Sequence, residues 1–288
     1  MELPSRRQPP TVRLRRLASE LRNLRQAAGL TREDAAEQTN INSATLYRIE
    51  TAKARPQRRT LLTLLDKYEV TDPARRAALV ELSKQATQLG WLQAYESELP
   101  EEYTTYISFE SEARSVRNYE SLFVPGLLQT DGYTRAVVTA SLPYASDNEI
   151  QQRVETRVQR QASITKDDPL KLWVIVDEAV LHRTVGGAEL MDGQLRHLAE
   201  TTNQPHITFQ VLPYTVGAHP GMHGAFAVMD FPDAADPELV YIENMAGALY
   251  LEKEGDVRRY AEMFDQLRAA ALNVADSRRL LTSLIDLD

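Results

Sequence analysis

Residues 30–50, LTREDAAEQTNINSATLYRIE, constrain the fold more than any other stretch of this chain. They predict two short helices joined by a tight turn. Thr31 is placed to cap the first helix, and Asp34 stands three positions later, as in a capping box. Asn40 stands at the turn, because Asn tolerates the left-handed conformation better than any residue except Gly. Asn42 can then cap the second helix.

The second helix is expected to bury one side and expose the other. Leu46 and Ile49 form an i, i+3 seam that faces inward, where Ala35 and Ala36 of the first helix permit a close crossing. The outer face is polar, has short side chains near the helix N-terminus and carries a single Arg, which suits insertion into the major groove of DNA. Its residues are Ser43, Ala44, Thr45, Tyr47, Arg48 and Thr51.

The same segment resembles the helix-turn-helix of the Xre/phage-repressor (Cro/C1-type) family. The match consists of the small residue Ala36, the turn residue Asn40, the cap Asn42 and the ending Ile49-Glu50. The family often has Gly where this chain has Asn40, which is a mild departure. The resemblance implies binding to double-stranded DNA. We therefore expect five residues of the second helix to read bases: Ser43, Ala44, Thr45, Tyr47 and Arg48.

The resemblance also implies roles for charged residues around this helix. Arg25 and Glu50 match a pair that joins the first helix of the domain to the end of the recognition helix, and we interpret this pair as structural. The family contacts DNA phosphates from the loop after the recognition helix and from the start of the helix before it. Such contacts position a protein without reading sequence. The expected phosphate-binding residues are Arg32, Asn42, Lys53, Arg55 and Arg58.

Charge is distributed unevenly along the chain. The formal net charge is −8, yet residues 1–60 hold 13 Lys and Arg against 6 Asp and Glu, a net of +7. Residues 61–288 hold 20 Lys and Arg against 35 Asp and Glu, a net of −15. A basic head on an acidic body is expected if the head alone meets phosphates.

Composition and helical patterning divide the chain into four segments. Residues 1–11, with two Arg and a Pro pair, are expected to form a flexible basic arm. Residues 12–89 predict a complete five-helix DNA-binding domain, whose fifth helix opens with a capping Asp and a Pro. Residues 90–103 are acidic, aromatic and irregular, and they predict a linker. Residues 104–288 predict a larger domain with its own core.

In the last segment, predicted strands alternate with predicted helices. Strands are expected over Tyr106–Phe109, Ser115–Glu120, Leu170–Asp177, Ile207–Leu212, Ala225–Phe231 and Leu239–Ile242, several of them rich in β-branched and aromatic residues. Helices are expected over Leu127–Ala140, Asn148–Thr165, Ala188–Asn203, Gly255–Ala271 and Val274–Leu284. The predicted fold is an all-α five-helix helix-turn-helix domain followed by a mixed α/β (α+β) domain.

Five phrases in this segment resemble a second family. They are Val124–Val137, Leu172–Gly187, Gln194–Glu200, Phe209–Val228 and Tyr250–Leu272. In this order they are similar to a large group of actinomycete regulators in which an Xre-type head precedes an uncharacterised, antitoxin-like domain. The resemblance covers essentially the whole chain. It implies a transcription factor, often encoded beside a small partner protein that engages the C-terminal domain, and it assigns no chemistry to these residues.

An enzyme or a metal site finds little support in the residues. His219 and His223, with Asp230 and Glu243 in sequence reach, are separated by a Pro-Gly turn, whereas His ligands at this spacing normally lie on a helix. The adjacent pair Asp177-Glu178 would point to opposite faces of a strand, so a helix cap or a salt bridge is the expected role. No HExxH, G-x-G-x-x-G or GK[ST] run exists. We therefore expect no catalytic residue, no metal and no cofactor.

The expected protein is a cytoplasmic, nucleoid-associated homodimer that does not enter membranes. It has no Cys, which excludes disulfides and thiolate metal sites, and no apolar run long enough to span a bilayer. The expected function is sequence-specific transcriptional regulation, with a small partner protein docked on the C-terminal domain. Two alternatives stay open. The same head can serve a small-molecule sensor, with residues 213–224 as a lid over a pocket, or a C-terminal enzyme.

Overall fold

The computed structural model describes residues 11–86, 99–233 and 236–285 of the chain. It consists of two compact units that divide between Phe109 and Glu110. Residues 1–10 of the arm predicted over residues 1–11 lie outside the described residues. Residues 90–98 of the linker predicted over residues 90–103 also lie outside them.

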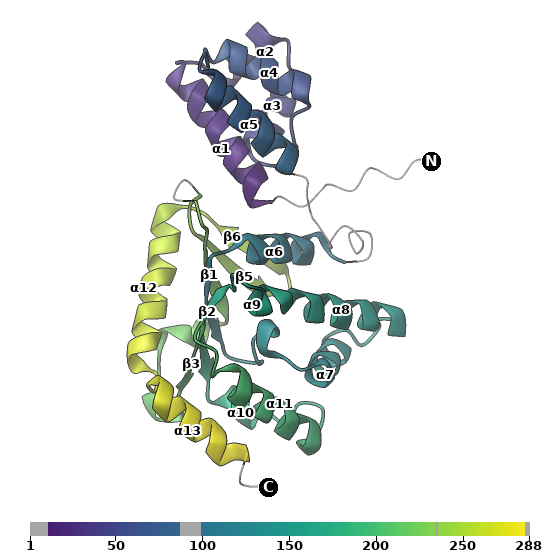
Figure 1. Ribbon diagram of the computed structural model, residues 1–288, viewed down its shortest axis with the longest axis vertical. Coiled ribbons are helices and arrows are strands. Elements are labelled where there is room, and N and C mark those ends of the chain that lie inside the picture. Colours follow the sequence, from purple (N-terminus) through teal and green to yellow (C-terminus); the bar gives the residue numbers. More distant parts are fainter. Residues whose placement is uncertain (1–10, 87–98, 234–235, 286–288) are drawn as a thin grey trace. The chain divides into compact units, whose positions relative to one another are not determined.

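The N-terminal unit begins with a head of five helices (Figure 1). Its core is made of aliphatic side chains that every helix contributes, among them Leu17, Leu21, Leu46, Ile49, Leu61, Leu64 and Leu79. The five-helix domain predicted from the sequence is thereby confirmed. The helices are α1 (Val12–Ala27), α2 (Arg32–Thr39), α3 (Ser43–Glu50), α4 (Arg58–Lys67) and α5 (Pro73–Gln85).

The helix caps read from the sequence are confirmed. Thr31 and Asp34 form a complete capping box at the start of α2, and the Asn42 side chain accepts a hydrogen bond from the Ala44 amide at 2.8 Å. Asp72 accepts from two amides at the start of α5, ahead of Pro73. Ala28 is the exposed C-cap of α1, and the buried row of α5 runs through Leu79, Ser83 and Ala86.

Helices α1 to α4 are each followed within two residues by a residue with positive φ, and only one of these is glycine. They are Gly29 (φ 71°), Asn40 (54°), Ala52 (55°) and Glu69 (56°). Ala52 is the unexpected choice, since a β-carbon costs roughly 1–2 kcal/mol in this conformation. Its side chain packs in a buried cluster with Leu14, Ala18 and Ala86, which offsets that cost. The turn also brings the Lys53 amide to the Arg48 carbonyl at 2.7 Å and so fixes the loop that follows α3.

The strand predicted over Tyr106–Phe109 is wrong, because these residues belong to helix α6 (Glu101–Glu112). The aromatic run has high strand propensity, but its apolar residues recur at helical spacing. Tyr103 and Tyr106 pack against Ile107, which is 1% exposed. Tertiary packing therefore overrides local propensity in this stretch.

The C-terminal unit is built around one six-stranded sheet with the order β3-β2-β1-β4-β5-β6. The first three strands in this order are parallel, and the other three pair antiparallel. The fold class predicted from the sequence is thereby confirmed. The strands are β1 (Ser115–Glu120), β2 (Lys171–Asp177), β3 (Ile207–Leu212), β4 (Phe226–Asp230), β5 (Leu239–Asn244) and β6 (Gly247–Leu251).

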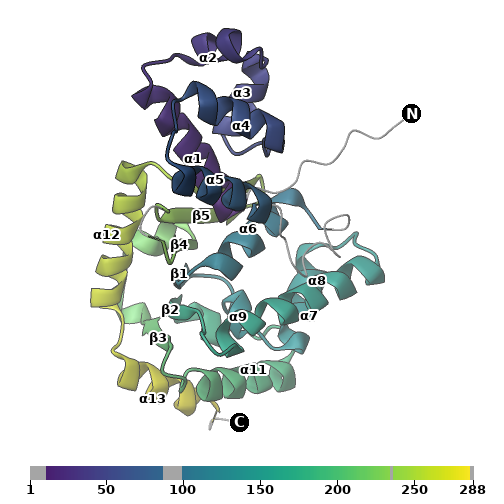
Figure 2. The same ribbon diagram turned by 45° about the horizontal axis from the view of Figure 1, so that its top comes forward.

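Helices cover both faces of the sheet, as Figures 1 and 2 show. β2 is consequently buried on both sides, which accounts for its continuous apolar run. One face carries α7 (Asp131–Ser141), α8 (Asp147–Arg160), α9 (Ala162–Thr165), α10 (Ala179–His182) and α11 (Ala188–Thr201). The other face carries α12 (Glu254–Ala270), while α13 (Val274–Ile285) packs against β3 and α11. Three short 3₁₀ turns, η2 (Gly126–Leu128), η3 (Tyr214–Val216) and η4 (Pro220–His223), lie in the connections.

Most of the predicted elements of this unit occur within two residues of their expected bounds. The helix expected over Asn148–Thr165 is divided at Gln161 into α8 and α9. The start of the helix expected at Leu127 is the turn η2, and α7 begins only at Asp131. Strand β6 was not predicted, since its last residues were assigned to the phrase that continues into α12.

Candidate nucleic-acid interface

Helix α3 exposes the side chains that the sequence assigned to base reading. Ala44, Thr45, Tyr47 and Arg48 are exposed and Ser43 is half-buried, whereas Leu46 and Ile49 are 0% and 2% exposed. The helix is thus divided into a core-facing side and a solvent-facing side.

The inner end of α3 is held by a buried cluster of charges around Glu50. Glu50 accepts from the Arg25 guanidinium at 2.6 Å (Nε to Oε1) and 3.1 Å (Nη2 to Oε2), and from Arg32 Nε at 3.3 Å. The side chains of Arg25 and Glu50 are 9% and 1% exposed. Arg25 also donates to the Leu30 carbonyl at 2.7 Å. One carboxylate therefore joins α1, α2 and α3.

Burial and charge shift the pKa of two groups in this cluster, Arg25 and Tyr68. The hydrogen bond to Glu50 raises the pKa of Arg25 above its ordinary value, so this guanidinium stays charged at any physiological pH. Burial raises the pKa of Tyr68 to about 12, and the nearby Glu50 carboxylate adds to the effect. Within the described residues, the buried Tyr68 hydroxyl has no hydrogen-bond partner. Sequence reasoning did not identify Tyr68, because only the packing of α4 brings it beside the pair.

Tyr47 lies between two cations on the outer surface of the head. The Arg32 guanidinium carbon is 5.2 Å from the centre of the Tyr47 ring, and Lys53 Nζ is 5.4 Å from it. Both distances are within the range of cation–π attraction. The ring therefore fixes the two side chains at the junction of α2, α3 and the following loop. This arrangement was not predicted, because Tyr47 was assigned to base reading alone.

The other residues assigned to phosphate contacts differ in how they are held. Lys53 and Arg58 are exposed, the latter in the first turn of α4. Arg55 is also exposed, and its Nη1 donates to the Ser83 carbonyl at 3.3 Å, which ties the loop to α5. Asn42 uses its side-chain oxygen to cap α3, so only its amide nitrogen remains to donate to a phosphate. Arg32, with its bonds to Glu50 and Tyr47, is the most firmly oriented of the set.

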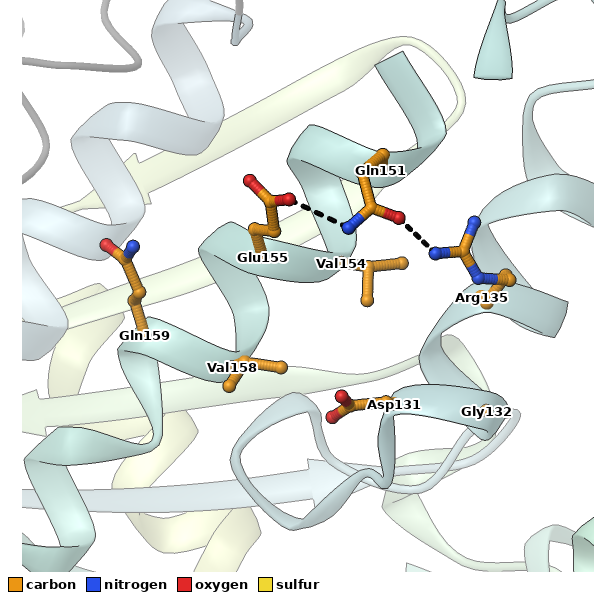
Figure 3. A pocket seen from close by; sticks show the side chains of 8 residues that line it. All are labelled: Asp131, Gly132, Arg135, Gln151, Val154, Glu155, Val158 and Gln159. Carbon is orange, nitrogen blue, oxygen red and sulfur yellow. Dashed lines mark hydrogen bonds between the residues drawn. The ribbon is translucent and has the colours of Figure 1, made fainter. Parts of the chain in front are cut away.

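The C-terminal unit has a groove of about 320 Å³ between α7 and α8 (Figure 3). Val154 and Val158 form an apolar strip along it. Arg135 donates to the Gln151 side chain, and Gln151 donates to Glu155 at 2.7 Å, so one rim is a chain of hydrogen bonds. The groove is further lined by Asp131, Gly132 and Gln159. An apolar strip between carboxylates suits a partner that offers an apolar side chain flanked by basic ones.

The loop that contains His219 and His223 makes structural contacts. His219 Nε2 lies 3.6 Å from Asp177, whose other oxygen accepts from the Ala179 amide at the start of α10. Asp230 pairs with Arg114 at 2.6 Å. Asp177 therefore caps a helix, which is one of the two roles expected for the Asp177-Glu178 pair. Among the described residues, no group of three or more His, Asp or Glu side chains is placed to hold a metal ion.

Two protein-family models match the chain. A helix-turn-helix domain model matches residues 16–79, and the model described as Domain of unknown function (DUF5753) matches residues 103–283. Searches of curated proteins and of solved structures find no match to the chain. In the described parts of the chain, no helix combines the length and the apolar composition that crossing a membrane requires. The first model agrees with the head built from α1 to α5. The Xre type of that head and the antitoxin-like character of the second domain stay predictions.

Proposed function

The chain belongs to the DUF5753 domain family, and on that premise we propose that it is a sequence-specific DNA-binding transcriptional regulator whose C-terminal domain receives the signal. The observation that carries the proposal is the outer face of α3. It is largely exposed and uncharged except for Arg48, and Arg32 and Lys53 lie against its Tyr47 ring. Catalysis has no part in this proposal.

In the proposed complex, α3 enters the major groove and the cations beside it bind phosphates. Arg48 is the best candidate for a guanine contact, because a guanidinium can donate to both O6 and N7 of the base. Two heads of a homodimer would occupy successive major grooves, about 34 Å apart along the duplex. The phosphate contacts come from Arg32, Asn42, Lys53, Arg55 and Arg58, and the base contacts from Ser43, Ala44, Thr45 and Arg48, with Tyr47 beside them.

The proposal is tested by titrating the full chain with the DNA just upstream of its own gene and with a random duplex, at several salt concentrations. If both heads of a dimer place Arg32, Lys53, Arg55 and Arg58 on phosphates, log K should fall with log salt at a slope of about −7. We expect tight binding to one duplex and weak binding to the other. Equal, weak binding to both at all salt concentrations would count against sequence-specific recognition.

We further propose that Tyr47 acts mainly through its ring, by holding Arg32 and Lys53 in place for phosphates. Tyr47→Ala removes two cation–π contacts and should weaken binding to selected and random DNA alike, by about 1–2 kcal/mol. Tyr47→Phe keeps the ring and should bind both duplexes as the wild type does. If Tyr47→Phe instead loses affinity for the selected duplex only, the hydroxyl reads a base and the positioning role is rejected.

The finer part of the proposal is that a small partner protein docks on the C-terminal domain. The groove between α7 and α8 supports this, because Val158 is 38% exposed between the carboxylates of Asp131 and Glu155. The test is calorimetric binding of a small protein encoded beside this gene. Val158→Lys should weaken that binding, while Glu262→Ala on α12 should not. A partner that binds both variants equally well would place the docking site elsewhere.

A further inference from the structure

The sheet of the C-terminal unit has two edges, and the described part of the chain shows how one of them is covered. At the β3 edge, the Leu272 amide donates to the Val211 carbonyl at 2.9 Å, and the Val211 amide donates to the Ser277 hydroxyl at 3.0 Å. Gln210 Nε2 adds a bond to the Leu272 carbonyl at 2.8 Å. The connection from α12 to α13 therefore protects this edge. Strand β6 forms the opposite edge of the sheet (Figure 1).

Strand β6 lacks the features that normally keep a sheet edge from pairing. Its sequence, Gly-Ala-Leu-Tyr-Leu, contains no charged residue and no proline, and its pairing with β5 is continuous from Gly247 to Leu251 without a bulge. Natural edge strands usually carry at least one such feature. An apolar, regular edge of this kind is a template for another strand.

The apolar face under α12 extends to this edge and ends in an uncovered side chain. Val240, Ile242 and Leu251 belong to the core that packs beneath α12. Leu249 stands opposite Ile242 in the ladder and continues the same row, but it is 54% exposed. A strand added at β6 would cover Leu249 and complete the row.

We propose that a second copy of this chain supplies that strand, with the two β6 strands antiparallel and Leu249 on the two-fold axis. The pairing places Gly247 opposite Leu251 and Ala248 opposite Tyr250 of the partner. None of these five positions carries a charge, so no like charges face each other across the axis, as a two-fold interface requires.

A second copy is favoured over an unrelated strand because the proposed binding to two successive major grooves also needs two heads. Helix-turn-helix proteins commonly bind DNA as two-fold dimers. The inference rests on the proposed function in this respect alone. It names the dimer interface as the β6 edge, which lies entirely within the C-terminal unit.

The mass of the full chain in solution, measured by light scattering without DNA, tests the proposal. The wild type should have twice the 32.5 kDa of one chain. Leu249→Lys places two like charges at the axis and should give the single-chain mass with an unchanged circular dichroism spectrum. Tyr144→Lys is the matched control, since Tyr144 is 99% exposed on the same unit, and it should stay dimeric. A monomeric wild type, or a dimeric Leu249→Lys, would overturn the proposal.

A cross-linking experiment covers the case in which Leu249→Lys fails to fold. The chain has no Cys, so one introduced thiol can pair only with its copy. Opposed residues of an antiparallel pair have their Cα atoms about 4.5–5.5 Å apart, within the range of a disulfide. Leu249→Cys should form a covalent dimer under mild oxidation, and Tyr144→Cys should not. Equal yields from the two variants would overturn the interface.

These outcomes are separate from those of the DNA titration. A chain that is monomeric in all these experiments and still selects its DNA overturns the β6 interface alone. A β6-linked dimer that binds no DNA selectively overturns the regulator proposal and leaves the interface standing.

Discussion

Replacing Glu50 by alanine is expected to destabilise the head by about 3–5 kcal/mol, the typical cost of leaving a buried charge without its partner. Glu50 is 1% exposed and binds the guanidinium groups of Arg25 and Arg32. Its removal leaves Arg25 buried and charged, because a guanidinium does not lose its proton in proteins. Since whole domains are stable by only about 5–15 kcal/mol, such a loss is a large part of the total.

Hydrogen exchange on the full chain can measure this loss in α1 and α3 directly. Glu37→Ala, an exposed carboxylate on α2, is the control and should change stability by no more than about 0.5 kcal/mol. The double variant Arg25→Met, Glu50→Leu should recover much of the loss, because it removes the buried charge as well as its partner. At temperatures where Glu50→Ala is still folded, its base preference should be that of the wild type. Unchanged exchange in α1 and α3 would show that the pair does not hold the head together.

The second large effect is expected at Glu110, in the last turn of α6. Arg160 of α8 donates to it at 2.9 Å (Nε to Oε1) and 2.8 Å (Nη2 to Oε2), and the two side chains are 5% and 2% exposed. Glu110→Ala removes the carboxylate and leaves the guanidinium in a buried site. We expect a loss of about 3–5 kcal/mol in the C-terminal unit.

Exchange protection of β1 and α8 reports this loss, while protection of α1 and α3 in the head should not change. Glu262→Ala on α12 is a suitable control, because that carboxylate is exposed. The double variant Glu110→Leu, Arg160→Met should recover part of the stability. A Glu110→Ala variant as stable as the control would mean that water enters and solvates Arg160, so that the pair contributes little.

The parts of the fold that could be predicted from the sequence are those fixed by local chemistry. The capping box of α2 and the buried seam of α3 depend on residues three or four positions apart. The left-handed conformation at Asn40 depends on the tolerance of Asn for positive φ. The division between a helical head and a mixed domain likewise follows from local periodicity. The positive φ of Ala52 and Glu69 was not predicted, because the chemistry of neither residue favours that conformation. The conformation of Ala52 is explained only by the packing of its side chain.

Elements that depend on distant neighbours could not be assigned in this way. Residues Tyr106–Phe109 have strand propensity, and only the packing of α6 makes them helical. Strand β6 is short and runs directly into the approach to α12, so its alternation was lost in the longer helical pattern. The sequence signal available for a hairpin was Gly247, which begins β6 and has a φ of 129°.

The same limit applies to the candidate site. The exposure of α3 follows from its own sequence, and the pairing of Arg25 with Glu50 was expected from a family resemblance. The stacking of Arg32 and Lys53 on Tyr47 was not, because it depends on how α2 crosses α3 and on the turn at Ala52. Residues that act by positioning others are visible only once the helices are placed.

The central claim is that α3 reads DNA sequence, and the most direct test compares Arg48→Ala with the wild type on the selected upstream duplex and on a random one. Arg48 is exposed on the proposed reading face, in the last turn of α3. We expect the variant to lose about 1–3 kcal/mol on the selected duplex, to tolerate changes at one base position, and to bind random DNA as before. An equal loss on both duplexes would make Arg48 a phosphate contact and would contradict base reading by this residue.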